Sequence, residues 1–361
     1  MTRKLAYIAR IEEVIAIEGA DRIVQYRIGG WRVIDQKDKY AVGDLVVYCE
    51  CDSWMPNTLA PFLTKADKYP KNYKGIDGER LKTIRLKNAL SQGLLLHIDT
   101  AANMFIGSKF DEGQEMGEFL FVGNDVTELL GIIKWEPEPE RVPVNAMGSF
   151  PSFIPKTDQE RIQNFMRSVE NYLEKNPDAT FTIEEKAEGS SVTVFQRDGD
   201  FGICSRNLRL KLEDQDVIMN SPFTQPAFAD NLKEKLASFC PNIALQFETI
   251  GPAVQGNYYN LGAWEYRLFD VYDIDTQKYY TPKEMRVLAD FLQIKTVPIL
   301  ETDFDIRGMT SDDFLNYAAS EPSRIGDLKN LMREGVVFKS NKGDRFTFKS
   351  VSNSYLLKTG R

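Results

Sequence analysis

Short alternating segments of apolar and polar residues, separated by glycines, fill the first hundred positions of the chain. Candidate strands lie at Leu5–Ala16, Arg22–Ile28, Trp31–Ile34 and Leu45–Cys51. Short strands with glycine punctuation at this spacing predict a small barrel or sandwich. We therefore expect residues 1–105 to form an OB-like β-barrel, a fold that offers loops and one face to nucleic acid. A β-domain that serves only for packing is the alternative.

Helical and strand patterns alternate after position 150. Thr157 and Glu160 match a capping box, and apolar residues then recur at helical spacing until Asn176-Pro177. A second capping box, Thr281 to Glu284, opens a helix through Leu292. A further helix is predicted at Phe228–Phe239. The predicted strands are Phe181–Ile183, Ser191–Gln196, Phe201–Ser205, Ile243–Ile250, Tyr266–Tyr272, Gly335–Ser340 and Arg345–Val351. This mixed order predicts an α+β domain over residues 151–361.

The segment between these two parts, residues 106–150, has a different composition. It is rich in acidic residues and carries Pro137, Pro139 and Pro143. Such a composition is typical of a connecting segment. We predict an acidic linker here, which gives the chain three parts with boundaries near residues 105 and 150.

Composition places the chain among ordinary globular proteins. Of its 361 residues, 42% are hydrophobic and 27% are charged. It has no run of about 20 apolar residues and no signal-peptide core at its N-terminus, so we expect a cytoplasmic protein without membrane contact. Cys49, Cys51, Cys204 and Cys240 form no Cys-x-x-Cys pair, and His97 is the single histidine. A zinc ribbon, a histidine-rich metal site and a Ser-His or Cys-His nucleophile are therefore disfavoured.

The net charge of −8 argues mildly against nucleic acid, but the local charge distribution does not. The segment Lys65–Lys87 contains eight basic and three acidic residues, for a net charge of +5. Phosphate contacts are made by such patches and not by the average charge. Nucleic acid is therefore a candidate partner, and nothing in the sequence implies a protein partner.

The stretch Glu184–Ser191 is the strongest candidate for chemistry. Lys186 stands where one predicted strand gives way to another, and Gly189 would let the backbone approach a ligand closely. A lysine amine becomes a nucleophile when desolvation or a nearby cation lowers its pKa. An ordinary surface turn is the alternative, because Lys-x-Glu-Gly alone is a weak motif. Glu248 lies on the polar face of its predicted strand and is a candidate to join the lysine.

Several short motifs form a set in a fixed order. They are Lys186-Ala187-Glu188-Gly189, Ser205-Arg206-Asn207, Phe247–Gly251, Leu268–Val271, Glu334–Lys339 and Phe348-Lys349. As a set they resemble the covalent nucleotidyltransferases, the superfamily of ATP-dependent ligases and capping enzymes. The resemblance implies antiparallel sheets flanked by helices, in an ATP-grasp-like ligase domain over residues 151–361.

Two further stretches narrow the resemblance. The segment Pro155–Asn164 looks like the lead-in of RNA ligases of the phage RNA ligase 2 type. The N-terminal part is similar to the RNA ligases that carry an OB domain ahead of the ligase domain. That similarity is carried by Ala20–Arg22, Gly30–Val33, Val42–Tyr48, Asp52–Pro56 and Leu90–Leu94. It extends the resemblance over most of the chain.

The resemblance implies an ATP-dependent RNA ligase that seals 3′-OH and 5′-phosphate ends, with a nick in duplex RNA as the expected substrate. Attack of Lys186 on ATP gives lysyl-AMP and pyrophosphate, AMP passes to the RNA 5′-phosphate, and the 3′-hydroxyl displaces it. Each step moves charge onto phosphate oxygens, so cations should supply most of the catalysis. Glu248 and Glu334 suit Mg²⁺ or Mn²⁺, which prefer oxygen ligands.

The resemblance also assigns the remaining site residues. Arg206, Lys339 and Lys349 are expected to bind phosphates. Phe269 is expected to stack on adenine, with a core residue as the alternative, and Glu185 to read the exocyclic amine. Lys156 and Arg161 complete the expected binding set through phosphate contacts, although Arg161 also fits a solvated helix position.

The sequence departs from the family pattern at two positions. Glu188 stands where many ligases have Asp and the phage group often has His, and Thr347 replaces the first of two lysines in the last motif. These departures put the detailed phosphate contacts in doubt. The rival interpretations are a DNA ligase or capping guanylyltransferase, and a non-catalytic RNA-binding protein that keeps the fold. Retention of Lys186, Glu248 and Glu334 together argues against the non-catalytic interpretation.

Overall fold

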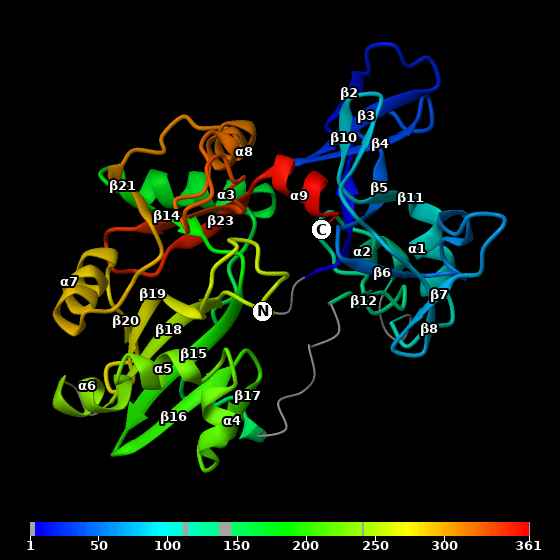
Figure 1. Ribbon diagram of the computed structural model, residues 1–361. Helices are drawn as coiled ribbons and strands as arrows, with labels where there is room; N and C mark the ends of the chain where they lie inside the picture. Colours follow the sequence, from blue (N-terminus) through cyan, green and yellow to red (C-terminus); the bar gives the residue numbers. More distant parts are fainter. Residues whose placement is uncertain (1–3, 111–114, 137–145, 240–241, 361) are drawn as a thin grey trace. The chain divides into compact units, whose positions relative to one another are not determined.

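The chain forms two compact units, which Figure 1 shows as ribbons. A computed structural model describes residues 4–110, 115–136, 146–239 and 242–360. The N-terminal unit comprises residues 1–139 together with residues 356–361, and the C-terminal unit comprises residues 140–355. Each unit buries its own hydrophobic clusters.

The N-terminal unit is built mainly of short antiparallel strands. Its elements are β1 (Ala6–Arg10), β2 (Glu13–Ala16), β3 (Ile23–Ile28), β4 (Trp31–Gln36), β5 (Leu45–Cys49), β6 (Ser53–Pro56), the 3₁₀ turn η1 (Pro61–Leu63), β7 (Lys71–Tyr73), β8 (Ile76–Arg80), β9 (Ile84–Leu86), β10 (Ala89–Ser91), β11 (Leu94–His97), α1 (Ile98–Phe105), α2 (Met116–Phe119) and β12 (Ile133–Lys134). The strand orders are β1-β5-β11, β2-β3-β4, β12-β6-β8-β7 and the hairpin β9-β10, which lies beside β4.

The segment Leu5–Ala16 is two strands and not the single strand that the sequence predicts. The chain changes partner between them, because the N–H of Ile11 donates to Asp44 O and the N–H of Glu12 donates to Arg27 O. As a result β1 pairs with β5, whereas β2 pairs with β3. A continuous apolar-polar alternation cannot reveal such a change of partner.

Part of the predicted acidic linker belongs to the packed N-terminal unit. Phe119, Val126, Leu130 and Ile132 are buried in the same cluster as Val47. Strand β12 extends the sheet by pairing with β6. The three prolines of the predicted linker lie outside the described residues, and the boundaries near residues 105 and 150 stay predictions.

The C-terminal unit contains two antiparallel sheets. Its elements are β13 (Ala146–Ser149), α3 (Ile162–Lys175), β14 (Phe181–Lys186), β15 (Ser190–Arg197), β16 (Asp200–Ser205), β17 (Leu208–Leu210), α4 (Gln215–Met219), α5 (Gln225–Ala229), α6 (Leu232–Phe239), β18 (Ile243–Ile250), β19 (Glu265–Asp273), β20 (Lys278–Tyr279), α7 (Pro282–Leu292), β21 (Ile299–Phe304), α8 (Ser311–Ala319), β22 (Gly335–Ser340) and β23 (Thr347–Val351). Helix α9 (Asn353–Thr359) begins in this unit, and its residues from Leu356 on are assigned to the N-terminal unit. The strand orders are β13-β17-β16-β15-β18-β19-β20 and β21-β14-β22-β23.

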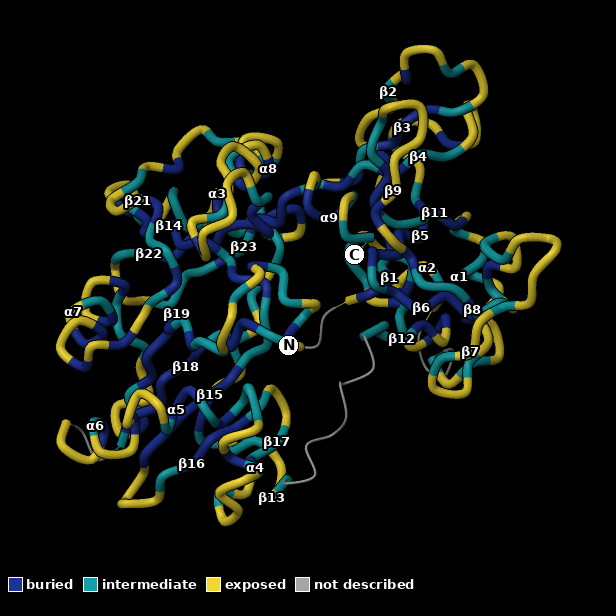
Figure 2. The backbone as a smooth tube through the Cα atoms, in the orientation of Figure 1, coloured by how far each residue is buried: buried dark blue, intermediate teal, exposed yellow. Residues whose placement is uncertain are grey.

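Helices cover one face of each sheet in this unit. Helices α6 and α7 pack on the seven-stranded sheet, whereas α3 and α8 pack on the four-stranded sheet (Figure 1). Leu245 and Phe247 of β18 lie in the first of these cores, and the central strands are dark blue in Figure 2. The alternation that the sequence predicts then leaves Gln246 and Glu248 on the opposite face of β18. The candidate site is built on this side of the sheet, opposite the helices.

One of the two predicted capping boxes is present. Thr281 accepts from the N–H of Glu284 and the Glu284 carboxylate accepts from the N–H of Thr281, so α7 begins as predicted. The box predicted at Thr157 and Glu160 is wrong, because α3 begins at Ile162. The backbone at Glu160 pairs instead with β23 of the four-stranded sheet, because Glu160 O accepts from the N–H of Lys349 at 2.9 Å.

The segment Phe228–Phe239 also differs from its prediction as one helix. Helix α5 ends at Ala229 and α6 begins at Leu232. Between them Asn231 has a φ of +52°, a left-handed conformation that ends a helix. The helical spacing of apolar residues continues through this break, so a prediction from periodicity alone treats the two helices as one.

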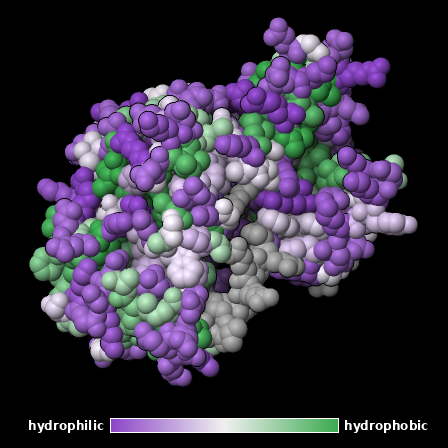
Figure 3. Space-filling view, in the orientation of Figure 1, coloured by the Kyte–Doolittle hydropathy of each residue, from purple (hydrophilic) through white to green (hydrophobic). Residues whose placement is uncertain are grey.

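The cysteines and the helices can be compared for the described part of the chain. Cys49, Cys51 and Cys204 are buried thiols outside disulfide bonds, and Cys240 lies outside the described residues. None of the described helices is long and apolar enough to cross a membrane. On the face shown in Figure 3, hydrophilic side chains surround scattered apolar ones, as is usual for a protein surface in water.

Candidate active site

Lys186 ends strand β14, and a short connector leads from it to β15. Within this connector, a Cβ atom on Gly189 would lie 2.3 Å from Thr249 O and 2.7 Å from the Cγ atom of Glu248. Only glycine permits so close an approach. The sequence analysis expected Gly189 to let a ligand approach the backbone closely. In the structure, the missing side chain lets β18 approach closely, and this brings Glu248 next to the connector.

An ion pair joins the predicted nucleophile to the predicted metal ligand. The Nζ atom of Lys186 lies 2.6 Å from Oε1 of Glu334. Pairing of β14 with β22 places Lys186 opposite Gly335, the residue after Glu334, so the ladder itself sets this contact. The second carboxylate oxygen of Glu334 is buried and accepts no hydrogen bond from the described residues.

The electrostatics of this group are dominated by burial and by three carboxylates. Burial by itself lowers the pKa of Lys186, but Glu334, Glu248 and Glu188 outweigh it and raise the pKa above its ordinary value. Burial raises the pKa of Glu248 to about 8, against the attraction of Lys186. Burial likewise raises the pKa of Glu334 to about 7. In the absence of a cation, the amine is therefore a protonated ammonium and not yet a nucleophile.

The donor set fits a hard divalent cation that also binds substrate. Glu248 and Glu334 supply two carboxylates, and the buried free oxygen of Glu334 is an available ligand. Among the residues that the structure describes, no cluster of three or more acidic, His or Cys side chains is arranged for a metal ion. Mg²⁺ is usually held by only one or two carboxylates, with water and substrate phosphates as the other ligands. The pair is sufficient for that mode of binding.

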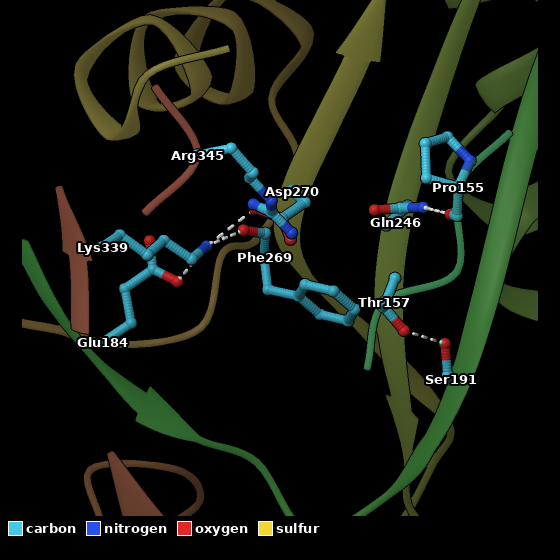
Figure 4. Close-up of polar contacts among 9 residues, drawn as sticks. All are labelled: Pro155, Thr157, Glu184, Ser191, Gln246, Phe269, Asp270, Lys339 and Arg345. Carbon is cyan, nitrogen blue, oxygen red and sulfur yellow. Dashed lines mark hydrogen bonds and ion pairs between the residues drawn. The ribbon is translucent and has the colours of Figure 1, made fainter. Parts of the chain in front are cut away.

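A polar pocket beside β15 gathers two of the predicted phosphate-binding residues. Arg206 lies 3.0 Å from Asp158, and Lys156 donates to Oδ1 of Asn207 at 2.9 Å. The pocket is lined by Phe150, Lys156, Thr157, Asp158, Ser191, Thr193 and Arg206. Figure 4 shows how the lead-in segment is held there, with Pro155 O accepting from Gln246 at 2.9 Å and the Thr157 and Ser191 hydroxyls 3.4 Å apart. Lys156 and Arg206 are thus brought together.

Lys349 and Arg161 lie next to each other at the edge of the second sheet. Arg161 is the N-cap residue of α3 and forms a parallel bridge with Lys349. The charge of Lys349 is close enough to oppose the raised pKa of Glu334. These contacts place Lys349 near the ion pair and bring Arg161 to the same region.

Lys339 is engaged in a buried network. Its Nζ atom lies 2.7 Å from Glu184 and 3.0 Å from Asp270, and it also donates to Phe269 O. Arg345 adds two hydrogen bonds of 2.6 Å to the Asp270 carboxylate. Figure 4 shows this network linking β14, β22 and β19, with only 6% of the Lys339 side chain exposed. The predicted phosphate contact of Lys339 stays a prediction, because its partners here are carboxylates.

Glu185 and Phe269 are held in place by different parts of the chain. The Glu185 carboxylate accepts from the Ser323 hydroxyl and, at 2.7 Å, from the N–H of Arg324. The Phe269 ring is half-buried against the cluster that contains Ala187, Ile250 and Tyr259, and it points toward the side occupied by Thr157 in Figure 4. The ring is therefore directed toward a residue of the pocket beside β15, while Glu185 is fixed by a loop that the sequence did not single out.

Glu184 and Asp270 carry out a structural task that the sequence analysis missed. Both lie within the quoted motifs, directly before Glu185 and directly after Phe269. Burial raises the pKa of Glu184 despite Lys339, whereas Lys339 and Arg345 outweigh burial and lower the pKa of Asp270. The available signal was a charged residue inside an apolar strand, which requires a partner.

Comparison with known structures identifies the family. A mutant of the Naegleria gruberi RNA ligase with AMP and Mn has 37% sequence identity and a TM-score of 0.84, covering 99% of this chain and 100% of that chain. The chain belongs to the RNA ligase family. A mutant of the same ligase with ATP and Mn also has 37% identity and a TM-score of 0.84, with 99% and 100% coverage. The ligase with PPi has 37% identity and a TM-score of 0.83, covering 98% of each chain.

Family models agree with the two-part architecture of this RNA ligase family member. The model described as RNA ligase matches residues 179–351, and an OB-fold domain model matches residues 5–98. No curated protein matches the chain. The matches confirm the predicted family, its α+β class and the N-terminal OB-like domain.

Proposed function

We propose that this protein is an ATP-dependent RNA ligase that joins 3′-OH and 5′-phosphate ends and carries AMP on Lys186. The observation that carries the proposal is the contact of 2.6 Å between Lys186 Nζ and Glu334 Oε1, with Glu248 beside it. A binding protein has no need for a partly buried lysine paired with a carboxylate. Relatives with 37% identity were solved with ATP and Mn, with AMP and Mn, and with PPi.

In the first step the Lys186 amine attacks the α-phosphorus of ATP. A P–N bond forms, the bond from the α-phosphorus to the bridging oxygen breaks, and pyrophosphate leaves. The ammonium must first lose a proton, which the three surrounding carboxylates oppose by raising its pKa. Mg²⁺ or Mn²⁺ bound by Glu248 and Glu334 would supply the positive charge that lowers the pKa of the amine and neutralises phosphate oxygens.

Basic and aromatic side chains bind and orient the nucleotide. Arg206 and Lys156 line the pocket beside β15, and Lys349 acts on Glu334; all three suit the phosphates of ATP or of the RNA end. Phe269 supplies an aromatic face for adenine, and it packs against the cluster that contains Ala187, the residue after the nucleophile. In this proposal Glu185 recognises the exocyclic amine of adenine. The N–H of Arg324, in a loop, holds the Glu185 carboxylate in one orientation.

The substrate proposed for the second and third steps is a nick in duplex RNA. The basic segment of the N-terminal unit supports this, since duplex RNA is bound largely through its backbone. Lys65, Lys68 and Lys74 are exposed there, and so are Arg85 and Lys87. Residues 1–105 act as the RNA-binding part, and residues 151–361 as the adenylyltransferase part. The buried reduced cysteines fit a cytoplasmic location.

Intact mass after incubation with ATP and Mn²⁺ tests the proposal. Wild type should gain the mass of one AMP, and Lys186→Ala should gain none. Lys342→Ala is the control and should gain the mass of one AMP as the wild type does, because its lysine pairs with the exposed Asp178 and lies outside the ion pair of the nucleophile. An adduct that persists in Lys186→Ala, or no adduct in a folded wild type, would overturn the assignment.

A further inference from the structure

Tyr355 makes a contact that no motif of the sequence announces. It lies in the first turn of α9, and its hydroxyl donates a hydrogen bond to Oε2 of Glu188, two residues after Lys186. Glu188 is 4% exposed and Tyr355 is 1% exposed. A hydrogen bond to a carboxylate in such a dry environment is among the stronger ones that proteins form.

The backbone of the same connector is held by a second tyrosine. The N–H of Glu188 donates to the hydroxyl oxygen of Tyr259 at 2.6 Å. Tyr258 packs edge-on against both Tyr259 and Tyr355, with ring centroids 5.4 Å and 5.5 Å apart, and its own hydroxyl donates to Met332 O. The three rings thus form a packed frame around Glu188, and this frame limits the freedom of the connector that starts at Lys186.

The start of α9 is also attached to the metal-ligand side of the site. The N–H of Tyr355 donates to the Ser352 hydroxyl at 3.3 Å, and the N–H of Ser352 donates to Glu334 O at 2.8 Å. One short segment therefore holds the backbone of Glu334 and the side chain of Glu188. These are two of the three carboxylates that act on the Lys186 ammonium.

We propose that Tyr355 is a positioning residue for lysine adenylylation, acting through Glu188 on the placement of the Lys186 amine. The inference rests on the proposed function and extends it to a residue outside the nucleotide site. In-line attack on phosphorus needs the nucleophile in one place, and a misplacement of about 1 Å can cost on the order of 100-fold in rate. Glu188 suits this task because an aspartate there would be one methylene shorter and would stop short of Tyr355.

A double-mutant cycle tests the proposal. The limiting single-turnover rate of lysyl-AMP formation is measured with ATP and Mn²⁺ for wild type, Tyr355→Phe, Glu188→Ala and the double variant. Tyr355→Phe should slow the wild-type reaction by about tenfold or more. In the Glu188→Ala background the same change should matter by less than about twofold. The ATP concentration for half-saturation should stay within about twofold, because placement of the amine does not hold the nucleotide.

Tyr266→Phe is the matched control for loss of a buried hydroxyl. Its hydroxyl donates to Phe223 O at 2.5 Å and its ring packs on Phe247 in the helix-covered core. This control should keep the wild-type rate. A merely structural role of Tyr355 would lower the amplitude of the burst or the melting temperature and leave the rate of the active fraction unchanged.

The outcomes separate this inference from the proposed function. If wild type forms no adduct, the proposed function fails and the inference fails with it. If wild type forms the adduct and Tyr355→Phe reacts at the same rate, only the inference is overturned. If Tyr355→Phe lowers the rate by the same factor in the wild-type and the Glu188→Ala backgrounds, the inference is overturned as well, because Tyr355 would then not act through Glu188.

Discussion

At the scale of single residues, the centre of the site is one ammonium among three carboxyl groups. Lys186 pairs with Glu334 and is influenced by Glu248 and Glu188. Buried carboxylates that lack a full set of cations hold their protons more tightly. Without a cation, the group is therefore arranged to keep its protons, and cation binding must release them.

This arrangement predicts a pH-dependent effect of Mn²⁺ on stability. The pKa of Glu248 is raised from 4.5 to about 8 in the folded protein. The folded state binds this proton more tightly than the unfolded state does, so protonation of Glu248 stabilises the folded protein. This contribution to stability is complete below pH 4.5 and is lost as the pH rises through 8. The melting temperature of the metal-free protein should therefore fall from pH 6 to pH 8.5, and deprotonation of Glu248 should account for part of this fall. The increase in melting temperature on adding Mn²⁺ should grow over the same interval, since the metal binds the deprotonated carboxylate.

Glu248→Gln is the control for this titration. Its side chain is neutral at every pH, so the fall between pH 6 and pH 8.5 should be shallower and the gain from Mn²⁺ smaller. Calorimetric scans at several pH values measure both quantities. A gain from Mn²⁺ of equal size at pH 6 and pH 8.5 in the wild type would contradict the assignment of Glu248 as a ligand.

The residues of the site were predictable to different degrees. Lys186, Glu248 and Glu334 each lie in a short motif at or beside a strand, and the alternation of β18 shows which way Glu248 points. Tyr259 and Tyr355 could not be found in this way. Their roles depend on hydroxyl contacts with Glu188 across 71 and 167 residues of sequence, which only the folded chain brings together.

At the scale of elements, a buried network joins the two sheets of the C-terminal unit. Lys339 of β22 contacts Glu184 of β14 in its own sheet and Asp270 of β19 in the other. Arg345 completes the pairing of Asp270 and stacks at 3.7 Å on the ring of Tyr279. Removing one partner from such a network leaves a buried charge without compensation, and the cost of that charge is much larger than the net value of the ion pair.

Lys339→Met should lower the free energy of unfolding by about 3–5 kcal/mol, because the Glu184 carboxylate loses its ammonium partner while remaining buried. Burial already raises the pKa of Glu184 in the wild type, so the destabilisation should shrink as the pH falls and Glu184 takes up a proton. Urea unfolding at two pH values measures this. Lys342→Met is the matched control, since its partner Asp178 is 77% exposed, and it should change stability little. Equal stabilities of the two variants would contradict a tightly coupled network.

The elements also show where local sequence signals lose their force. The box at Thr281 and Glu284 forms with both of its reciprocal hydrogen bonds at the start of helix α7. The same residue spacing at Thr157 and Glu160 fails because β23 offers the backbone another hydrogen bond. Capping chemistry is local, whereas strand pairing is not, so no local pattern indicates which one prevails.

At the scale of the whole molecule, the chain separates the residues proposed for AMP transfer from those proposed for RNA binding. All of the former lie between Lys156 and Tyr355, in the C-terminal unit. The basic segment lies in the N-terminal unit, where it is divided between two hairpins. Lys65 and Lys68 precede the β7-β8 hairpin, whereas Arg85 lies in the β9-β10 hairpin beside β4. RNA contacts and lysine adenylylation should therefore be separable by substitution.

Replacing Lys65 and Lys68 together by alanine should weaken binding of nicked duplex RNA and leave lysyl-AMP formation unchanged. For each RNA phosphate that the variant no longer neutralises, the slope of log affinity against log salt should become shallower by about 0.7–0.9. Titrations of RNA at several salt concentrations, beside the adduct assay, measure the two effects. Lys233→Ala with Lys283→Ala removes the same charge from exposed positions of the C-terminal unit, so it shows how much of the change comes from net charge alone. Equal weakening by both pairs would mean that the segment acts only through the overall charge, whereas a parallel loss of the adduct would mean that it supports the fold of the catalytic part.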